Sequence, residues 1–135
     1  MVFDQIGKFY AVYKLNNVYA HKVFMGILRF AIVRNNGAAF GLMAKKPILL
    51  KFISSLLIVL LLAYLTYNTV NCGPAGETLS LSFIAGGALG NFTDRIRQNY
   101  VVDFVSLNIK SGRFPFFNFA DIFIFFGFIL LFVYL

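Results

Sequence analysis

The ten residues GGALGNFTDR, numbers 86–95, change from small apolar side chains to polar ones along a single stretch of chain. Gly86 and Gly90 are four residues apart, and on a helix this spacing gives a smooth face that a second helix can approach closely. A second stripe at helical spacing consists of Gly87, Asn91 and Asp94, with Arg95 beside it. The stretch therefore predicts the polar end of a closely packed membrane helix.

The composition indicates a membrane protein of one domain. Of the 135 residues, 60% are hydrophobic and 13% are charged, and the mean hydropathy is +0.80. Soluble domains carry about 25% charged residues. The net charge of +7 predicts contact with the anionic head groups of a phospholipid bilayer rather than with nucleic acid. We expect a single membrane domain over residues 1–135, and a monomer.

Three apolar stretches are candidate transmembrane helices, so the fold class that we expect is an all-α polytopic membrane protein. They cover roughly 47–67, 78–97 and 114–135. Each has about the 20 residues that a helix needs to cross a bilayer. The connection 68–77 contains Asn, Gly and Pro, which favour a tight turn. Within residues 1–46, the β-branched and aromatic residues of KVFMGILRFAIVRN (22–35) predict a small β element at the membrane surface.

Two of the five acidic residues form a candidate catalytic pair. Asp103 lies in the polar link 98–113, which we expect to be a loop, and Asp121 lies about two turns inside the last predicted helix. Asn118 is three residues before Asp121 and would share its side of that helix. Two carboxylates in a partly dry site share a proton, so that one acts as base while the other acts as acid. The pair therefore predicts attack of water on a peptide carbonyl without a metal or a cofactor.

The same residues have structural explanations that the sequence leaves open. Asp121 could be a solvated or capping residue at a helix end, and Asn118 could join helices by hydrogen bonding. Asp94 and Arg95 could form an ion pair at a helix terminus, and the glycines could serve packing alone. A small ion or proton transporter would need charged groups along a path through the bilayer, whereas these acidic residues gather on one face. A truncated, inactive or regulatory membrane protein is the remaining alternative.

Five motifs occur in the order and spacing of the bacterial lipoprotein signal peptidases, also called signal peptidase II. They are DQIGK at 4–8, NNGAAFG at 35–41, GGALGNFTDR at 86–95, VVDF at 101–104 and FNFAD at 117–121. Together they cover nearly the whole chain, which therefore resembles this family of aspartic peptidases. The resemblance implies an enzyme that cuts a diacylglyceryl-modified prolipoprotein before its lipidated cysteine and releases the signal peptide.

The resemblance also implies roles for single residues. It makes Asp103 and Asp121 the catalytic dyad. The residues that it places in substrate binding or in support of the dyad are Asp4, Lys8, Asn35, Gly37, Asn91, Arg95, Asn118 and Ala120. It implies no metal and no cofactor.

The chain departs from the family pattern at its amino end and in its charges. Family members have four transmembrane helices, and the first ends near the Asp-Gln motif. That motif begins here at residue 4, so we expect the first helix to be absent from this chain. All twelve Lys and Arg lie in residues 1–51 or 95–113, and the positive-inside rule would put that face in the cytoplasm. The resemblance implies the opposite orientation, with the site near the periplasmic face of the bacterial inner membrane.

Overall fold

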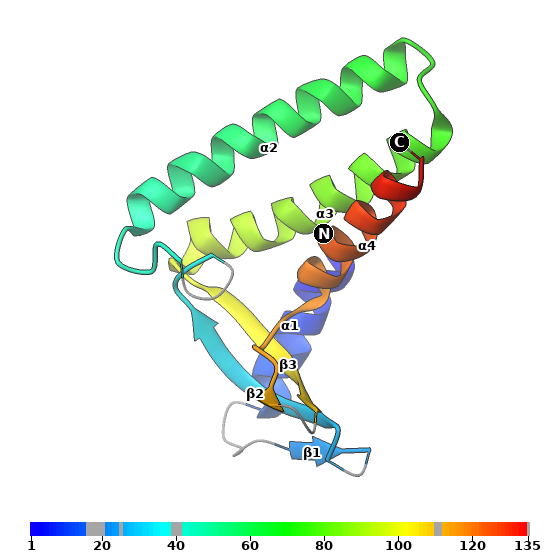
Figure 1. The fold of residues 1–135 in the computed structure, drawn as a ribbon. Coiled ribbons are helices and arrows are strands. Elements are labelled where there is room, and N and C mark those ends of the chain that lie inside the picture. Colours follow the sequence, from blue (N-terminus) through cyan, green and yellow to red (C-terminus); the bar gives the residue numbers. More distant parts are fainter. Residues whose placement is uncertain (16–20, 25, 39–41, 110–111, 135) are drawn as a thin grey trace.

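The computed structural model describes residues 1–15, 21–24, 26–38, 42–109 and 112–134. In chain order the elements are α1 (Val2–Leu15), β1 (His21–Val23), β2 (Leu28–Asn35), α2 (Pro47–Val70), α3 (Ala75–Gln98), β3 (Val101–Ile109), β4 (Gly112–Arg113) and α4 (Phe119–Tyr134). The sheet extends away from α2, α3 and α4, and β1 is the strand furthest from these helices (Figure 1). The fold is thus mostly helical with a small sheet, as predicted.

The described strands form an antiparallel sheet in the order β1-β2-β3-β4. In the register of β2 with β3, Val33 lies opposite Asp103. The strand β3 reads VVDFVSLNI, and its many β-branched residues favour an extended backbone. Phe104 and Val105 of this strand form a small hydrophobic core with Ala11 of α1. This core holds α1 against the sheet.

In the helical layer, α3 packs against both α2 and α4. α2 is a leucine-rich run that begins at Pro47, where the missing amide hydrogen costs no hydrogen bond. α3 ends at Gln98, because the next residue, Asn99, takes a left-handed conformation with φ of 67° that stops the helix. The tight connection predicted within 68–77 is confined to residues 71–74, because α2 continues to Val70 and α3 begins at Ala75.

Glycines let α3 and α4 approach each other closely at two points. A Cβ atom added to Gly87 would overlap the carbonyl oxygen of Ala120 and lie 2.7 Å from Ile124 Cγ1. A Cβ atom on Gly127 would lie 2.6 Å from Ile84 Cγ1. Only a residue without a side chain fits at either point, so these two glycines set the distance between the helices.

Of the two glycines predicted to form a close helix face, only Gly90 lies in a close contact. A Cβ atom on Gly90 would lie 2.8 Å from Asp4 Oδ2, so this glycine makes room for α1. The nearest atom to a Cβ on Gly86 would be the Met1 nitrogen at 3.7 Å, which is ordinary contact. The contact with α4 involves Gly87 and also Gly90, where an added Cβ would lie 3.3 Å from Ala120 Cβ.

One helix in the described part of the chain has both the length and the hydropathy of a membrane span, and it is α2. α4 is strongly apolar but has 16 residues. α3 has 24 residues, yet it carries Glu77 in its first turn and Arg95 and Arg97 in its last. The three predicted spans are therefore not confirmed as a set.

Two other expectations need correction, and one helix was not expected. Residues 98–113, expected to be a loop, contain β3 and β4. The last helix begins at Phe119 rather than near 114, so Asp121 lies in its first turn and not two turns inside it. Residues 2–15 form α1, a helix that the sequence pattern did not indicate. The β element predicted at 22–35 is confirmed by β1 and β2.

Replacing Gly87 by alanine should destabilise the protein, because the new methyl group overlaps the backbone of α4 at Ala120. Overpacking of this kind costs about 1–3 kcal/mol. Gly86→Ala is the matched control, because its methyl group meets nothing closer than 3.7 Å and alanine favours a helix. Thermal unfolding of both variants in one detergent measures the difference. Equal unfolding midpoints for the two variants would contradict this packing.

Candidate active site

The amino end of α4 is closed by Asn118 and Asp121, which cap each other. The backbone N–H of Asp121 donates to Asn118 Oδ1 at 3.0 Å, and the backbone N–H of Asn118 donates to Asp121 Oδ2 at 3.1 Å. This reciprocal pair is a capping box, with Asn118 directly before the helix and Asp121 in its first turn. The spacing within FNFAD therefore has a local cause, and the capping role that the sequence left open for Asp121 is confirmed.

Asp103 lies on β3 with 2% of its surface exposed. Both of its carboxylate oxygens accept hydrogen bonds from side-chain amides. Oδ2 accepts one from Asn35 Nδ2 at 3.0 Å, and Oδ1 accepts one from Asn118 Nδ2 at 2.7 Å. Because Asn35 ends the paired strand β2 and Asn118 precedes α4, the sheet and the helix together fix the orientation of this carboxylate.

Asn118 joins the two carboxylates of the candidate pair. Its side-chain amide bonds to Asp103, its backbone N–H bonds to Asp121, and the residue is fully buried. Asp121 Oδ1 accepts a further hydrogen bond from Asn91 Nδ2 at 2.8 Å. Each of the four carboxylate oxygens accordingly accepts an amide N–H, and every one of these donors is neutral.

Burial raises the pKa of Asp103 to about 6, well above the ordinary value of an aspartate. Desolvation is the largest cause, and the negative charge of Asp121 raises this pKa further. The hydrogen bonds from Asn35 and Asn118 lower it, because they stabilise the charged form. A carboxyl group with this pKa exchanges its proton close to neutral pH, as general acid–base chemistry requires.

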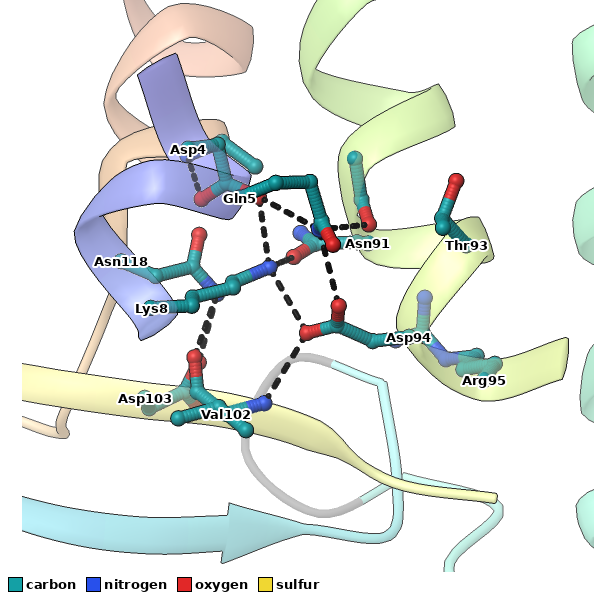
Figure 2. Close-up of polar contacts among 12 residues, drawn as sticks. Asp4, Gln5, Lys8, Asn91, Thr93, Asp94, Arg95, Val102, Asp103 and Asn118 are labelled. Atoms are coloured by element: carbon teal, nitrogen blue, oxygen red, sulfur yellow. Dashed lines mark hydrogen bonds and ion pairs between the residues drawn. The ribbon is translucent and has the colours of Figure 1, made fainter. Parts of the chain in front are cut away.

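A buried ammonium group, that of Lys8 on α1, lies between residues of α3 and of its own helix (Figure 2). Lys8 Nζ pairs with Asp4 at 2.7 Å and with Asp94 at 2.9 Å, and it donates to Asn91 Oδ1 at 3.1 Å. The side chains of the three charged residues are at most 5% exposed. Among the described residues, Asp94 thus forms its ion pair with Lys8 and not with its chain neighbour Arg95.

The two carboxylates around this ammonium also hold backbone groups in place. Asp4 Oδ1 accepts the N–H of Ala120 at 2.9 Å, and Asp94 Oδ2 accepts the N–H of Val102 at 3.2 Å. Gln5 Nε2 donates to Asp94 Oδ1 at 2.9 Å. These bonds tie α1 to α3, to the first turn of α4 and to β3, so that all four elements meet at one buried charged cluster.

Asn91 connects Lys8 to the candidate pair by hydrogen bonds. Because Lys8 Nζ donates to Asn91 Oδ1, the amide nitrogen of Asn91 faces the other way. That nitrogen donates to Asp121 Oδ1, while Asn118 Nδ2 donates to the same Asn91 Oδ1 at 3.0 Å. Lys8 is therefore linked to Asp121 through the side-chain amide of Asn91, which accepts from Lys8 and donates to Asp121.

A cleft of about 650 Å³ opens beside the pair. Its polar lining includes Arg34, Asn35, Asn36, Gly37, Asn91, Arg95, Asp103 and Asp121. Its apolar lining includes Phe116, Phe117, Ile124, Phe125 and Phe128. Arg95 donates from Nη2 to the carbonyl oxygen of Gly37 at 3.1 Å, which joins α3 to the chain after β2. The cleft thus combines groups that can bind a peptide with a wall that can bind hydrocarbon.

The site residues proposed from the sequence divide between this cleft and the buried network next to it. The network contains Asp4, Lys8, Asn118 and Ala120. Ala120 is fully buried, and its part in the network is its backbone N–H, which donates to Asp4 Oδ1. Residues 39–41 of the NNGAAFG motif lie outside the described residues. In the described part of the chain, no group of three His, Cys, Asp or Glu side chains could hold a metal ion.

The sequence motifs predicted no role for three residues of this region. Gln5 lies within DQIGK and Val102 within VVDF, so the motifs contained both without assigning them a role. Phe116 precedes FNFAD and lines the cleft. Its position depends on how the segment before α4 folds back along β3, where Phe117 bridges to Val105, and no local pattern encodes that.

Comparison with known proteins gives a consistent result. The family model described as signal peptidase (SPase) II matches residues 1–135. A lipoprotein signal peptidase from Clostridium tetani is 36% identical over 136 residues, which cover 100% of this chain and 86% of that protein. One from Clostridium novyi is 33% identical over 138 residues, which cover 100% of this chain and 90% of that protein.

A solved structure has the same fold. It is described as a bacterial membrane enzyme, determined by the in meso method at 2.3 Å resolution. The TM-score is 0.80 and the sequence identity 31%, and the match covers 98% of this chain and 79% of that one. Together with the apolar helix α2, this likeness makes the present protein membrane-bound.

Replacing Lys8 by methionine should destabilise the protein by about 3–5 kcal/mol, because Asp4 and Asp94 are left as buried carboxylates without a cation. Lys14→Met is the matched control on the same helix, because Lys14 is exposed. Thermal unfolding of both variants in one detergent gives the comparison. If Lys8→Met unfolds at the same temperature as Lys14→Met, the buried ion pairs do not hold these elements together.

Proposed function

This chain belongs to the signal peptidase II family, and on that premise we propose that it is an aspartic endopeptidase of the bacterial inner membrane. Its substrate is a prolipoprotein that already carries diacylglycerol on a cysteine thiol. It cuts the peptide bond before that cysteine and so releases the signal peptide. Family membership supports the removal of signal peptides from prolipoproteins, and the aspartic mechanism is inferred from the site.

The observation that carries this mechanism is the pairing of two carboxylates through one asparagine. Asp103 and Asp121 both bond to Asn118, and both line the same cleft. Their remaining oxygens bond to Asn35 and Asn91, which hold them in place without supplying a positive charge. A pair held in this way keeps a proton close to neutral pH, as the raised pKa of Asp103 indicates.

In the resting pair one carboxyl group is ionised and the other is protonated. The carboxylate takes a proton from a water molecule as the water oxygen attacks the scissile carbonyl carbon. The protonated partner gives its proton to the carbonyl oxygen, which forms a neutral gem-diol intermediate. In the second step the first group returns its proton to the leaving nitrogen, while the second removes a proton from one hydroxyl. The C–N bond then breaks, and the pair regains its starting state.

The lining of the cleft suits both parts of such a substrate. Arg95 and Asn35 present N–H donors that can bind peptide carbonyl oxygens. Phe125 and Phe128 line the cleft and are more than half exposed on α4, so a substrate that moves sideways through the bilayer can reach them. The acyl chains would lie along this wall and bring the lipidated cysteine to the pair.

The arrangement in the membrane is part of the proposal. Because α2 has the properties of a span and α3 packs against both α2 and α4, we infer that the three helices lie in the bilayer together. The pair lies where these helices meet the sheet, and we assign this end to the periplasmic face. We further propose that residues 1–135 act as one membrane domain and as a monomer.

Asp103→Asn and Asp121→Asn should each reduce cleavage of a lipidated prolipoprotein by about 10²–10⁴-fold or more, because an amide cannot cycle the proton. Glu77→Gln is the matched control at the far end of α3, where Glu77 accepts a hydrogen bond from Tyr64. The readout is the rate of signal-peptide release, normalised to the amount of protein in the membrane. Full activity in either aspartate variant would overturn the dyad.

Raising the pH should slow cleavage, with a midpoint near pH 6. Burial and the negative charge of Asp121 raise the pKa of Asp103 to about 6, so Asp103 is the group that holds the proton of the pair; above this pH it loses that proton and the pair has no acid left. Asn35→Ala should shift the midpoint to higher pH, because the hydrogen bond that this variant removes lowers the pKa of Asp103. Profiles of kcat/KM against pH for both proteins test this. A midpoint near pH 4, or one that Asn35→Ala leaves unchanged, would show that Asp103 does not supply the acid.

A further inference from the structure

Within the described part of the chain, two buried side-chain nitrogens have no hydrogen-bond partner, and they are the Nε atoms of Arg29 and Arg95. A buried donor without a partner is costly, so one that persists in a native protein points to a ligand that completes it. Arg95 lines the cleft and already belongs to the proposed site. Arg29 has no role in the function proposed above.

Arg29 lies next to the same cleft. It precedes Val33 by four residues on β2, and Val33 is part of the cleft wall. A β-bulge between Phe30 and Val33 interrupts the strand alternation, so it is a side-chain contact that places Arg29 at the cleft. The Cζ atom of Arg29 lies 5.6 Å from the ring centre of Phe116, which also lines the cleft. The guanidinium group is therefore held against an aromatic ring at the cleft margin.

Among the described residues, the charge of Arg29 has no acidic partner. All five acidic residues of the sequence lie in the described part of the chain, and the ion pairs found there are both made by Lys8. Arg29 is partly buried, so its charge is partly desolvated. A guanidinium group in this state, with N–H donors to spare, favours a carboxylate as ligand.

We propose that Arg29 binds an acidic side chain of the substrate, in the mature segment that follows the lipidated cysteine. This inference rests on the function proposed above. The sheet extends away from the helices (Figure 1), so a peptide that leaves the pair along β2 moves away from the helical layer. The signal peptide is apolar and stays among the helices, whereas the mature segment is the part that follows the sheet.

The spacing along β2 identifies the substrate positions that reach Arg29. Val33 lies opposite Asp103 and Arg29 lies opposite Ser106, and a β-bulge separates the two pairs. Asp103 and Ser106 are three strand residues apart, which corresponds to about 10 Å, the length of about three residues of an extended substrate. An acidic side chain roughly two to four residues after the lipidated cysteine would therefore meet the guanidinium group.

The test compares two lipidated prolipoprotein peptides that differ only in having aspartate or asparagine at these positions. With the full-length protein in lipid nanodiscs, we expect kcat/KM to be about tenfold higher for the aspartate peptide, mainly through KM. Arg29→Gln should remove this preference. Lys22→Gln is the matched control, because Lys22 lies opposite Arg29 in the β1–β2 register and is exposed. This variant loses the same charge and should keep the preference.

A second measurement separates this inference from the proposed function. The same two peptides, each with an uncleavable reduced bond before the lipidated cysteine, are titrated into the protein, and their affinities are measured by fluorescence anisotropy. A tenfold preference for aspartate that Arg29→Gln removes supports the inference even if no peptide is cleaved, and absence of cleavage then counts against the proposed function alone. Equal binding of both peptides by the unaltered protein overturns the role of Arg29. If Arg29→Gln weakens the binding of both peptides equally, the proposed role is also overturned, because Arg29 then binds the substrate backbone and not the acidic side chain.

Discussion

The ammonium group of Lys8 is the interaction on which the rest of the site depends. It lies in a buried place between the carboxylates of Asp4 and Asp94, and each of these also accepts a backbone N–H. Through Asp4 it holds the first turn of α4, and through Asp94 it holds the start of β3. Those two elements carry Asp121 and Asp103. The buried ion pairs therefore hold in place the elements that carry the candidate pair.

Neutral amides hold the candidate pair, and the absence of a positive charge on these donors affects the pKa of Asp103. Asn35, Asn91 and Asn118 direct N–H groups at the carboxylate oxygens, so each oxygen has a defined position. An arginine or lysine in direct contact would give similar order but would stabilise the ionised form strongly. The amides lower the pKa of Asp103 less than burial raises it, and the net result is a value of about 6. The carboxylate oxygens are therefore held in defined positions, and Asp103 can still exchange a proton close to neutral pH.

Much of the membrane-facing architecture was predictable, and the errors have physical reasons. Residues 47–67 form a helix because a long apolar run with Pro47 at its start has no competing signal. The strand β3 was taken for a loop because its polar residues hid a β-branched run whose longest pairing is with residues some 70 positions earlier. Asp121 was placed too deep in its helix because FNFAD continues an apolar stretch, while the capping box begins the helix at Phe119.

By itself, the sequence determined which family the chain resembles and predicted a set of site residues, because motifs are local and their order along the chain is visible. It also determined that one small-residue face on α3 permits close packing. Only the tertiary structure decided which glycine faces α4 and which cation Asp94 meets, since each depends on the rotation of a helix relative to its neighbours. Likewise, it decided that Asn118 reaches two carboxylates at once. One of these lies fifteen residues earlier on a strand, and no periodicity within either segment encodes their approach.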